Sequence, residues 1–146
     1  MSNKIDVETL LKKPYWLIDI LPKKVPAEAA GQYFKVEHYF LDRLEKLSLK
    51  FSDMLLKLNC YMDLSVSHDG ENWTLNPAPE DLAVHFRESI DSRLSLFILV
   101  EPGNAVLTFS GDEHWMTLYN SDGDLLSLIS ELASSEGLFV WKPNML

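Results

Sequence analysis

Apolar residues recur at helical spacing through a long stretch between residues 33 and 58. They are separated by three or four positions, which is the pattern of an amphipathic helix. The sequence leaves open whether this helix breaks near "LSLKFSD", because Ser52 and Asp53 would suit the start of a second helix. The intervening lysines and glutamates are expected to form the solvent-facing side.

Shorter helices are marked by residues that start or stop a helix. Asp6 can cap a short helix in "VETLLKK", and Pro79 with the acids after it begins another in "PAPEDLAVHFRESI". A third helix follows Ser121 or Asp122 in "SDGDLLSLISELAS", with Gly137 as its stop signal.

Strands are predicted where apolar residues alternate with polar ones or run continuously. The dipeptide Asp-Gly in "HDGE" predicts a hairpin turn between the strand 61–67 and a return at "NWTL", and "GDE" at 111–113 predicts a second turn. The nearly continuous apolar run at 93–100 is typical of a central strand. The other predicted strands are 15–21, 105–110, 114–120 and 138–141.

This succession of hairpins and helices predicts an α+β fold. We expect an antiparallel or mixed sheet of about six to seven strands, with helices packed mainly on one face. A length of 146 residues fits one domain, residues 1–146, with a core that needs no disulfide or metal.

The charge is distributed unevenly. Residues 1–60 carry ten basic and eight acidic residues, whereas residues 61–146 carry three basic and fourteen acidic residues, and the whole chain has a net charge of −9. An acidic half of this kind disfavours nucleic acid as a ligand and favours a basic protein partner, although solubility alone explains it equally well.

Several features predict a cytoplasmic protein. There is no apolar run long enough to span a membrane, and the first residues lack the apolar stretch of a secretory signal. Cys60 is the one cysteine, so no internal disulfide can form, and we expect its side chain in the core.

The stretch "GDEHW" places Asp112, Glu113 and His114 side by side and suggests a catalytic or metal site. Adjacent residues of an extended chain point to alternate sides and chelate one ion poorly. The four histidines are dispersed and match no catalytic or zinc motif. The sequence therefore predicts a polar turn here, with no catalytic residue, no metal and no cofactor.

Asp19 lies inside the apolar strand "WLIDIL". Burial of a carboxylate is costly unless it is paired, so we expect Asp19 on an exposed strand face. A buried ion pair or a functional acid are the alternatives.

The C-terminal run "GDEHWMTLYNSDGDLLSLISELASSEGLFVWKP" resembles the ends of small, acidic α+β immunity-type proteins of bacterial polymorphic toxin systems. The resemblance covers about residues 93–143 and carries no catalytic motif. It implies a non-enzymatic inhibitor that binds a toxin domain.

Three functional hypotheses follow. The first is a protein-binding, inhibitor-type protein, monomeric or homodimeric, whose acidic C-terminal half engages a basic partner such as a toxin domain. The second is a small-molecule-binding domain with an aromatic-lined pocket between sheet and helices. The third is an enzyme with Asp19 or His114 as general base. The residues expected to contact a partner are Asp112, Glu113, His114, Trp115, Tyr119, Asp122, Asp124, Asp69, Glu71 and Trp73.

Overall fold

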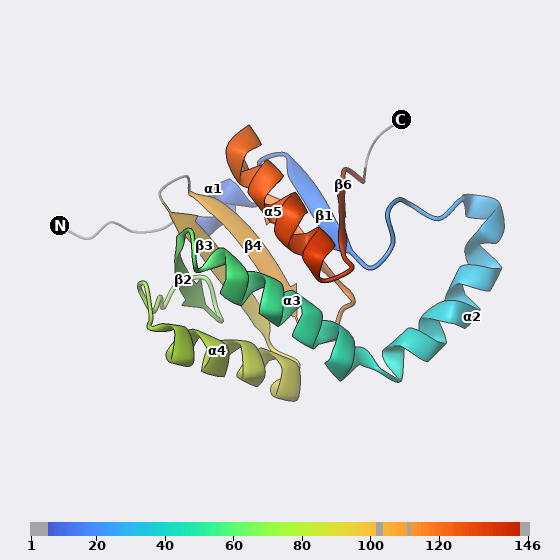
Figure 1. Ribbon diagram of the computed structural model, residues 1–146, viewed down its shortest axis with the longest axis horizontal. Coiled ribbons are helices and arrows are strands. Elements are labelled where there is room, and N and C mark those ends of the chain that lie inside the picture. The colour runs from blue at the N-terminus through green and yellow to red at the C-terminus, as the bar shows by residue number, and fades with distance from the viewer. Residues whose placement is uncertain (1–5, 102–103, 111, 144–146) are drawn as a thin grey trace.

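Six strands form an antiparallel sheet in the computed structural model, which describes residues 6–101, 104–110 and 112–143 (Figure 1). The strand order is β2-β3-β4-β5-β1-β6. The α+β class and the size of the sheet confirm the prediction. The strands are β1 (Tyr15–Asp19), β2 (Asp63–Ser67), β3 (Ser95–Glu101), β4 (Ala105–Ser110), β5 (Trp115–Tyr119) and β6 (Phe139–Trp141).

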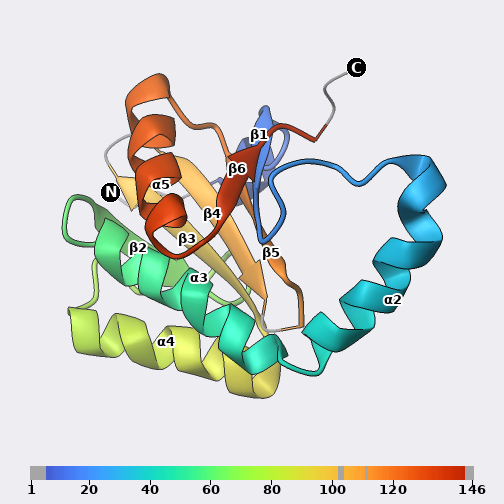
Figure 2. The same cartoon turned by 45° about the vertical axis from the view of Figure 1, so that its right-hand side comes forward.

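Helices α3, α4 and α5 cover one face of this sheet, as predicted, and the short α1 lies behind it (Figure 1). In contrast, α2 stands beside the sheet and covers neither face (Figure 2). The α-helices are α1 (Val7–Leu10), α2 (Ala30–Leu41), α3 (Leu44–Leu58), α4 (Pro79–Ser92) and α5 (Gly123–Ser135), and a 3₁₀ turn (Ala27–Ala29) precedes α2.

The local signals at the helix ends act as predicted. The Asp6 carboxylate accepts a hydrogen bond from the Thr9 amide (3.2 Å), and Asp122 accepts one from the Leu125 amide (2.8 Å). Pro79 is the first residue of α4. Gly137 follows α5 with a φ of 75°, a conformation that favours glycine.

The core lies between the sheet and the three long helices. Alternate residues of β1 and β5 face it, so Ile18 and Met116 are paired and fully buried. Leu107 and Ile98 continue this apolar layer across β4 and β3. The core residues of the helices include Phe51, which packs 6.3 Å from the ring of Phe109.

The long amphipathic stretch breaks earlier than expected. Arg43 leaves the helical conformation, whereas Ser52 and Asp53 lie inside α3 rather than at a second start. The break separates two environments: the apolar face of α3 is buried, but α2 leaves apolar side chains such as Phe34 and Tyr39 exposed. Periodicity alone does not distinguish these cases.

Three further predictions are wrong. Asp19 is buried, with 9% of its surface exposed, rather than lying on an exposed strand face. Cys60 is exposed, because it follows the last buried residue of α3, Leu58. The return at "NWTL" forms only an isolated bridge between Val66 and Thr74, and the strand that pairs with β2 along its whole length is β3.

Within the described part of the chain, no helix is both long enough and apolar enough to cross a membrane.

Replacement of Leu107 by alanine tests the packing of this core. We expect the free energy of unfolding to fall by about 2–5 kcal/mol, because a fully buried side chain leaves a cavity. Urea unfolding monitored by circular dichroism measures this. The matched control, Leu75→Ala, removes a leucine that is 69% exposed and should change stability by less than about 0.5 kcal/mol. Equal effects of the two variants would contradict the assignment of the core.

Candidate functional site

The end of the sheet where β1 stops and β5 starts brings together polar side chains from distant parts of the sequence. The antiparallel register places Asp19 opposite Trp115, and His114 precedes Trp115 in the chain. Tyr33 and Glu37 come from α2, four residues apart, so they project from the same side of that helix. We call Asp19, Tyr33, Glu37 and His114 the His114 cluster.

His114 is the centre of this cluster, with only 3% of its surface exposed. Its Nε2 lies 2.7 Å from Glu37 Oε2, which also accepts a hydrogen bond from the Tyr33 hydroxyl (2.9 Å). Its Nδ1 lies 3.8 Å from Asp19 Oδ1, too far for a direct hydrogen bond but close enough for strong electrostatic attraction. The imidazole therefore sits between two carboxylates.

These contacts shift the pKa values of the groups. Burial lowers the pKa of His114, but the carboxylates of Asp19 and Glu37 outweigh it, so the pKa is raised above the ordinary value of 6.5. The hydrogen bond with His114 lowers the pKa of Glu37. Burial, followed by the hydrogen bond to Glu37, raises the pKa of Tyr33. The two carboxylates thus favour the protonated form of His114, in which both ring nitrogens are donors.

A hollow of about 340 Å³ opens beside the cluster, and we call it the aromatic pocket. Two of its lining residues have buried N–H groups without a hydrogen-bond partner among the described residues: His114 at Nδ1 and Trp141 at Nε1. Such orphan donors are rare in folded proteins, where buried polar groups are nearly always paired. The residues that line it are Leu17, Asp19, Leu21, Lys23, Lys24, Val25, Tyr33, His114, Trp115 and Trp141.

The aromatic pocket meets one requirement of the enzyme hypothesis. Asp19 and His114 do meet in it, which the enzyme hypothesis requires. The raised pKa of His114 increases the share of its protonated form, which can act as a general acid. Serine, threonine and cysteine are absent from the described residues that line the pocket, and the hydroxyl among them is that of Tyr33, whose pKa is raised by burial.

Asp112 and Glu113 lie at the same end of the sheet, in the turn before β5. The Glu113 amide donates to the Ser110 carbonyl, which confirms a turn, and the Ser110 hydroxyl donates to Asp112. Gly111 lies outside the described residues. Burial raises the pKa of Glu113. Trp115 is half-buried and packs edge-on to His114, with ring centroids 4.9 Å apart.

The loop after β2 contains Asp69, Glu71 and Trp73. Asp69 and Glu71 line a second hollow, of about 630 Å³, between the 69–71 loop and α1. We call it the acidic groove. Asp69 shapes its own loop, because its carboxylate accepts hydrogen bonds from the amides of Glu71 and Asn72, at 2.8 Å each. These amides lower the pKa of Asp69. The Trp73 indole donates to the Gly70 carbonyl.

Tyr119, Asp122 and Asp124 lie at the opposite end of the sheet. Tyr119 is the last residue of β5 and pairs with Tyr15 at the start of β1, whereas Trp115 pairs with Asp19 at its end. Asp122 is the cap of α5. The ten predicted contact residues therefore form no continuous surface. The distances between these residues along the sequence did not indicate that they lie at two ends of the sheet.

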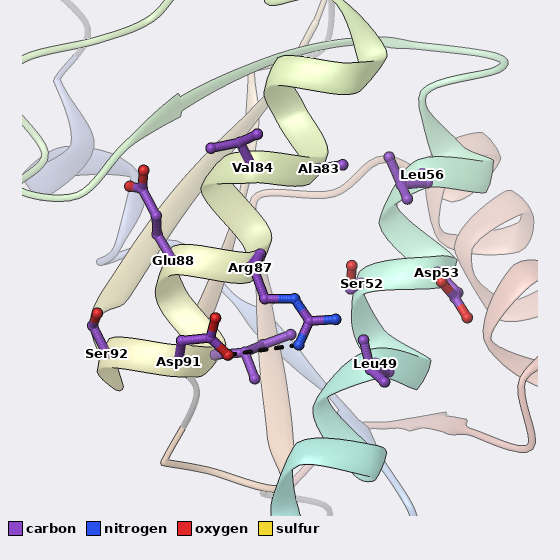
Figure 3. Close-up of a pocket in the computed structure, with 11 residues that line it drawn as sticks. Leu49, Ser52, Asp53, Leu56, Ala83, Val84, Arg87, Glu88, Asp91 and Ser92 are labelled. Carbon is purple, nitrogen blue, oxygen red and sulfur yellow. Dashed lines mark ion pairs between the residues drawn. The ribbon is translucent and has the colours of Figure 1, made fainter.

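A third hollow separates α3 from α4 and contains none of the ten predicted contact residues (Figure 3). Arg87 reaches across it from α4 and contacts Glu45 of α3 at 3.2 Å and Asp91 of its own helix at 3.6 Å. These exposed ion pairs contribute little to stability.

Sequence reasoning missed the main contributors to the aromatic pocket. The spacing of Tyr33 and Glu37 indicates a shared helix face, but nothing local connects that face to His114. Trp141 was expected in a strand, and its pairing with Leu17 of β1 brings it to the pocket. Lys23 and Lys24 lie between the predicted strand 15–21 and the predicted helical stretch 33–58, where the sequence predicts no helix or strand.

Comparisons with protein-family models, curated proteins and solved structures found no match to this chain.

Replacement of Glu37 by glutamine tests the ion pair with His114. Because the pKa of His114 is raised in the folded state, protonation of this ring stabilises the fold. The contribution is complete below pH 6.5 and is lost as the pH rises through the folded-state pKa. Because the pKa of Glu37 is lowered in the folded state, ionisation of this carboxyl group also stabilises the fold. That contribution is complete above pH 4.5 and is lost as the pH falls through the folded-state pKa. Both contributions are complete between pH 4.5 and 6.5, so Glu37→Gln should be most destabilising there.

Urea unfolding of both proteins in buffers across this window measures the difference, and NMR titration of the His114 ring should show a lower midpoint in Glu37→Gln. The exposed Glu131→Gln variant is the control. A destabilisation by Glu37→Gln that stays constant at higher pH would argue against a charged His114.

Proposed function

We propose that this protein binds a small molecule in the aromatic pocket, which was the second hypothesis from the sequence. What supports the proposal is that one hollow is lined by both His114 and Trp141, and that each has a buried ring nitrogen without a hydrogen-bond partner among the described residues. Its volume of about 340 Å³ lies in the range of ligand sites. It opens at the sheet end rather than between the sheet and its covering helices.

The lining residues indicate the chemistry of the ligand. Trp115, Trp141 and Tyr33 offer aromatic surfaces for a flat apolar group. The two N–H donors require acceptor atoms, and Lys23 and Lys24 add positive charge at the pocket. A planar apolar molecule that carries an anionic acceptor group, such as an aromatic carboxylate, fits these features.

The Trp141→Phe variant tests the role of the indole N–H, because it keeps an aromatic ring and removes the donor. A panel of aromatic carboxylates of one and two rings, including naphthoate, should shift the NMR resonances of His114 and Trp115. We expect Trp141→Phe and His114→Gln to weaken this binding about tenfold, since a hydrogen bond to a charged group is worth about 1.5–3 kcal/mol.

Two controls are built into this experiment. Trp73→Phe changes a tryptophan that lies outside the aromatic pocket and should leave the affinity unchanged. Naphthylmethanol, which has the same rings without the carboxylate, should bind more weakly than naphthoate. Equal loss in Trp73→Phe and Trp141→Phe, or no shift at the pocket with any carboxylate, would refute the proposal.

A second candidate function, binding of a basic protein partner as in immunity-type inhibitors, is supported by the acidic groove. Asp6, the N-cap of α1, and Glu8 line it together with Asp69 and Glu71 of the loop, around the half-buried Phe97. None of the described lining residues is basic. An acidic rim around an apolar floor suits a partner that presents arginine or lysine beside an apolar side chain.

Charge reversal at Glu8 and Glu71 tests this candidate. Both are exposed, and unlike Asp69 neither shapes the loop. A fluorescein-labelled peptide of alternating arginine and leucine serves as the probe, and its affinity should fall with salt. The variant Glu8→Lys/Glu71→Lys should weaken binding and flatten the salt dependence.

Reversal of two exposed acids on α5, Asp124→Lys/Glu131→Lys, makes the same change in net charge elsewhere and should have a smaller effect. Equal effects of the two double variants would assign the binding to net charge alone and refute the groove.

The proposal includes a cytoplasmic location. What supports it is the single cysteine, since proteins of oxidising compartments commonly contain disulfides.

A further inference from the structure

Three potential metal ligands meet on the surface beside α4, away from the aromatic pocket. His68 comes directly after β2, and His85 and Glu88 are three residues apart on α4, so they share one side of that helix. One ligand atom from each of the three lies within 4.8 Å of the others. All three are partly or fully exposed, so an ion has access.

The distances between these atoms match those around a tetrahedral zinc ion. Bonds of about 2.0–2.1 Å in tetrahedral geometry place neighbouring ligand atoms about 3.4 Å apart. His68 Nε2 lies 3.4 Å from His85 Nδ1 and 3.6 Å from Glu88 Oε2. Small rotations of exposed side chains are enough to place an ion between them.

The hydrogen bond of His68 Nδ1 fixes the ring tautomer that leaves Nε2 able to bind a metal ion. Nδ1 lies 3.1 Å from the carbonyl oxygen of Ser95, the first residue of β3, and donates to it. Nε2 then carries the lone pair that a metal needs. Metal-binding histidines commonly have such a support on the other ring nitrogen.

Glu88 is available as the third ligand. Figure 3 shows its side chain on the side of α4 that faces away from α3, whereas Arg87 points toward α3. Arg87 is paired with Glu45 and Asp91 instead. Among the described residues, no lysine or arginine forms an ion pair with Glu88.

We propose that His68, His85 and Glu88 bind a divalent transition-metal ion, with Zn²⁺ as the best match. Two imidazoles and one carboxylate are the ligand types that zinc prefers, and three protein ligands leave a fourth position for water or another exchangeable group. The site joins the end of β2 to α4. It is independent of the proposed functions of the aromatic pocket and the acidic groove.

Titration of the untagged, chelator-treated protein with zinc chloride, followed by calorimetry, tests this site. We expect one equivalent to bind and to raise the melting temperature, because the ion binds the folded state. His68→Gln and His85→Gln should each weaken zinc binding at least tenfold. His38→Gln and Cys60→Ser are the controls, since these exposed residues lie outside the cluster and should leave the affinity unchanged.

NMR of the imidazole nitrogens in the unaltered protein gives a test that depends on no variant. Zinc should shift His68 Nε2 and His85 Nδ1 and leave His38 and His114 in place. Failure to bind zinc, unchanged affinity in His68→Gln/His85→Gln, or shifts confined to other histidines would each overturn the proposal.

Discussion

The antiparallel pairing of β1 with β5 is the contact on which both the sheet and the aromatic pocket depend. It joins segments from opposite ends of the chain, and β6 adds to the other edge of β1. One side of this pair supplies Ile18 and Met116 to the core. The other side supplies Asp19 and Trp115 to the pocket. A shift of register by one residue would reverse these roles and expose the core residues.

The position of α2 depends on charge more than on apolar packing. Its apolar residues Phe34 and Tyr39 are exposed, whereas Tyr33 and Glu37 contact His114. An imidazolium that is buried at this depth requires nearby carboxylates to offset its desolvation. The His114 cluster therefore attaches a helix and, at the same time, raises the pKa of a side chain that lines the aromatic pocket.

Many acids of the C-terminal half have local structural roles, which changes the meaning of the net charge. Asp69 organises a loop, Asp122 caps α5, and Glu136 forms an ion pair with Lys57 of α3. Other acids, such as Glu71, have exposed side chains without such a role. Composition counts both kinds equally, so charge alone overstates the size of an acidic binding surface.

The sequence by itself determined the fold class, most of the strands, the helix starts at Asp6 and Pro79 and, to within one residue, the start at Asp122, because periodicity, capping and turn residues act over a few positions. Only the tertiary structure decided that Asp19 is buried beside His114, that α2 separates from α3, and that the predicted contact residues lie at two ends of the sheet. These outcomes depend on strand order and register, which are set by the packing of segments far apart in the chain. Local patterns carry no information about which distant side chains will meet.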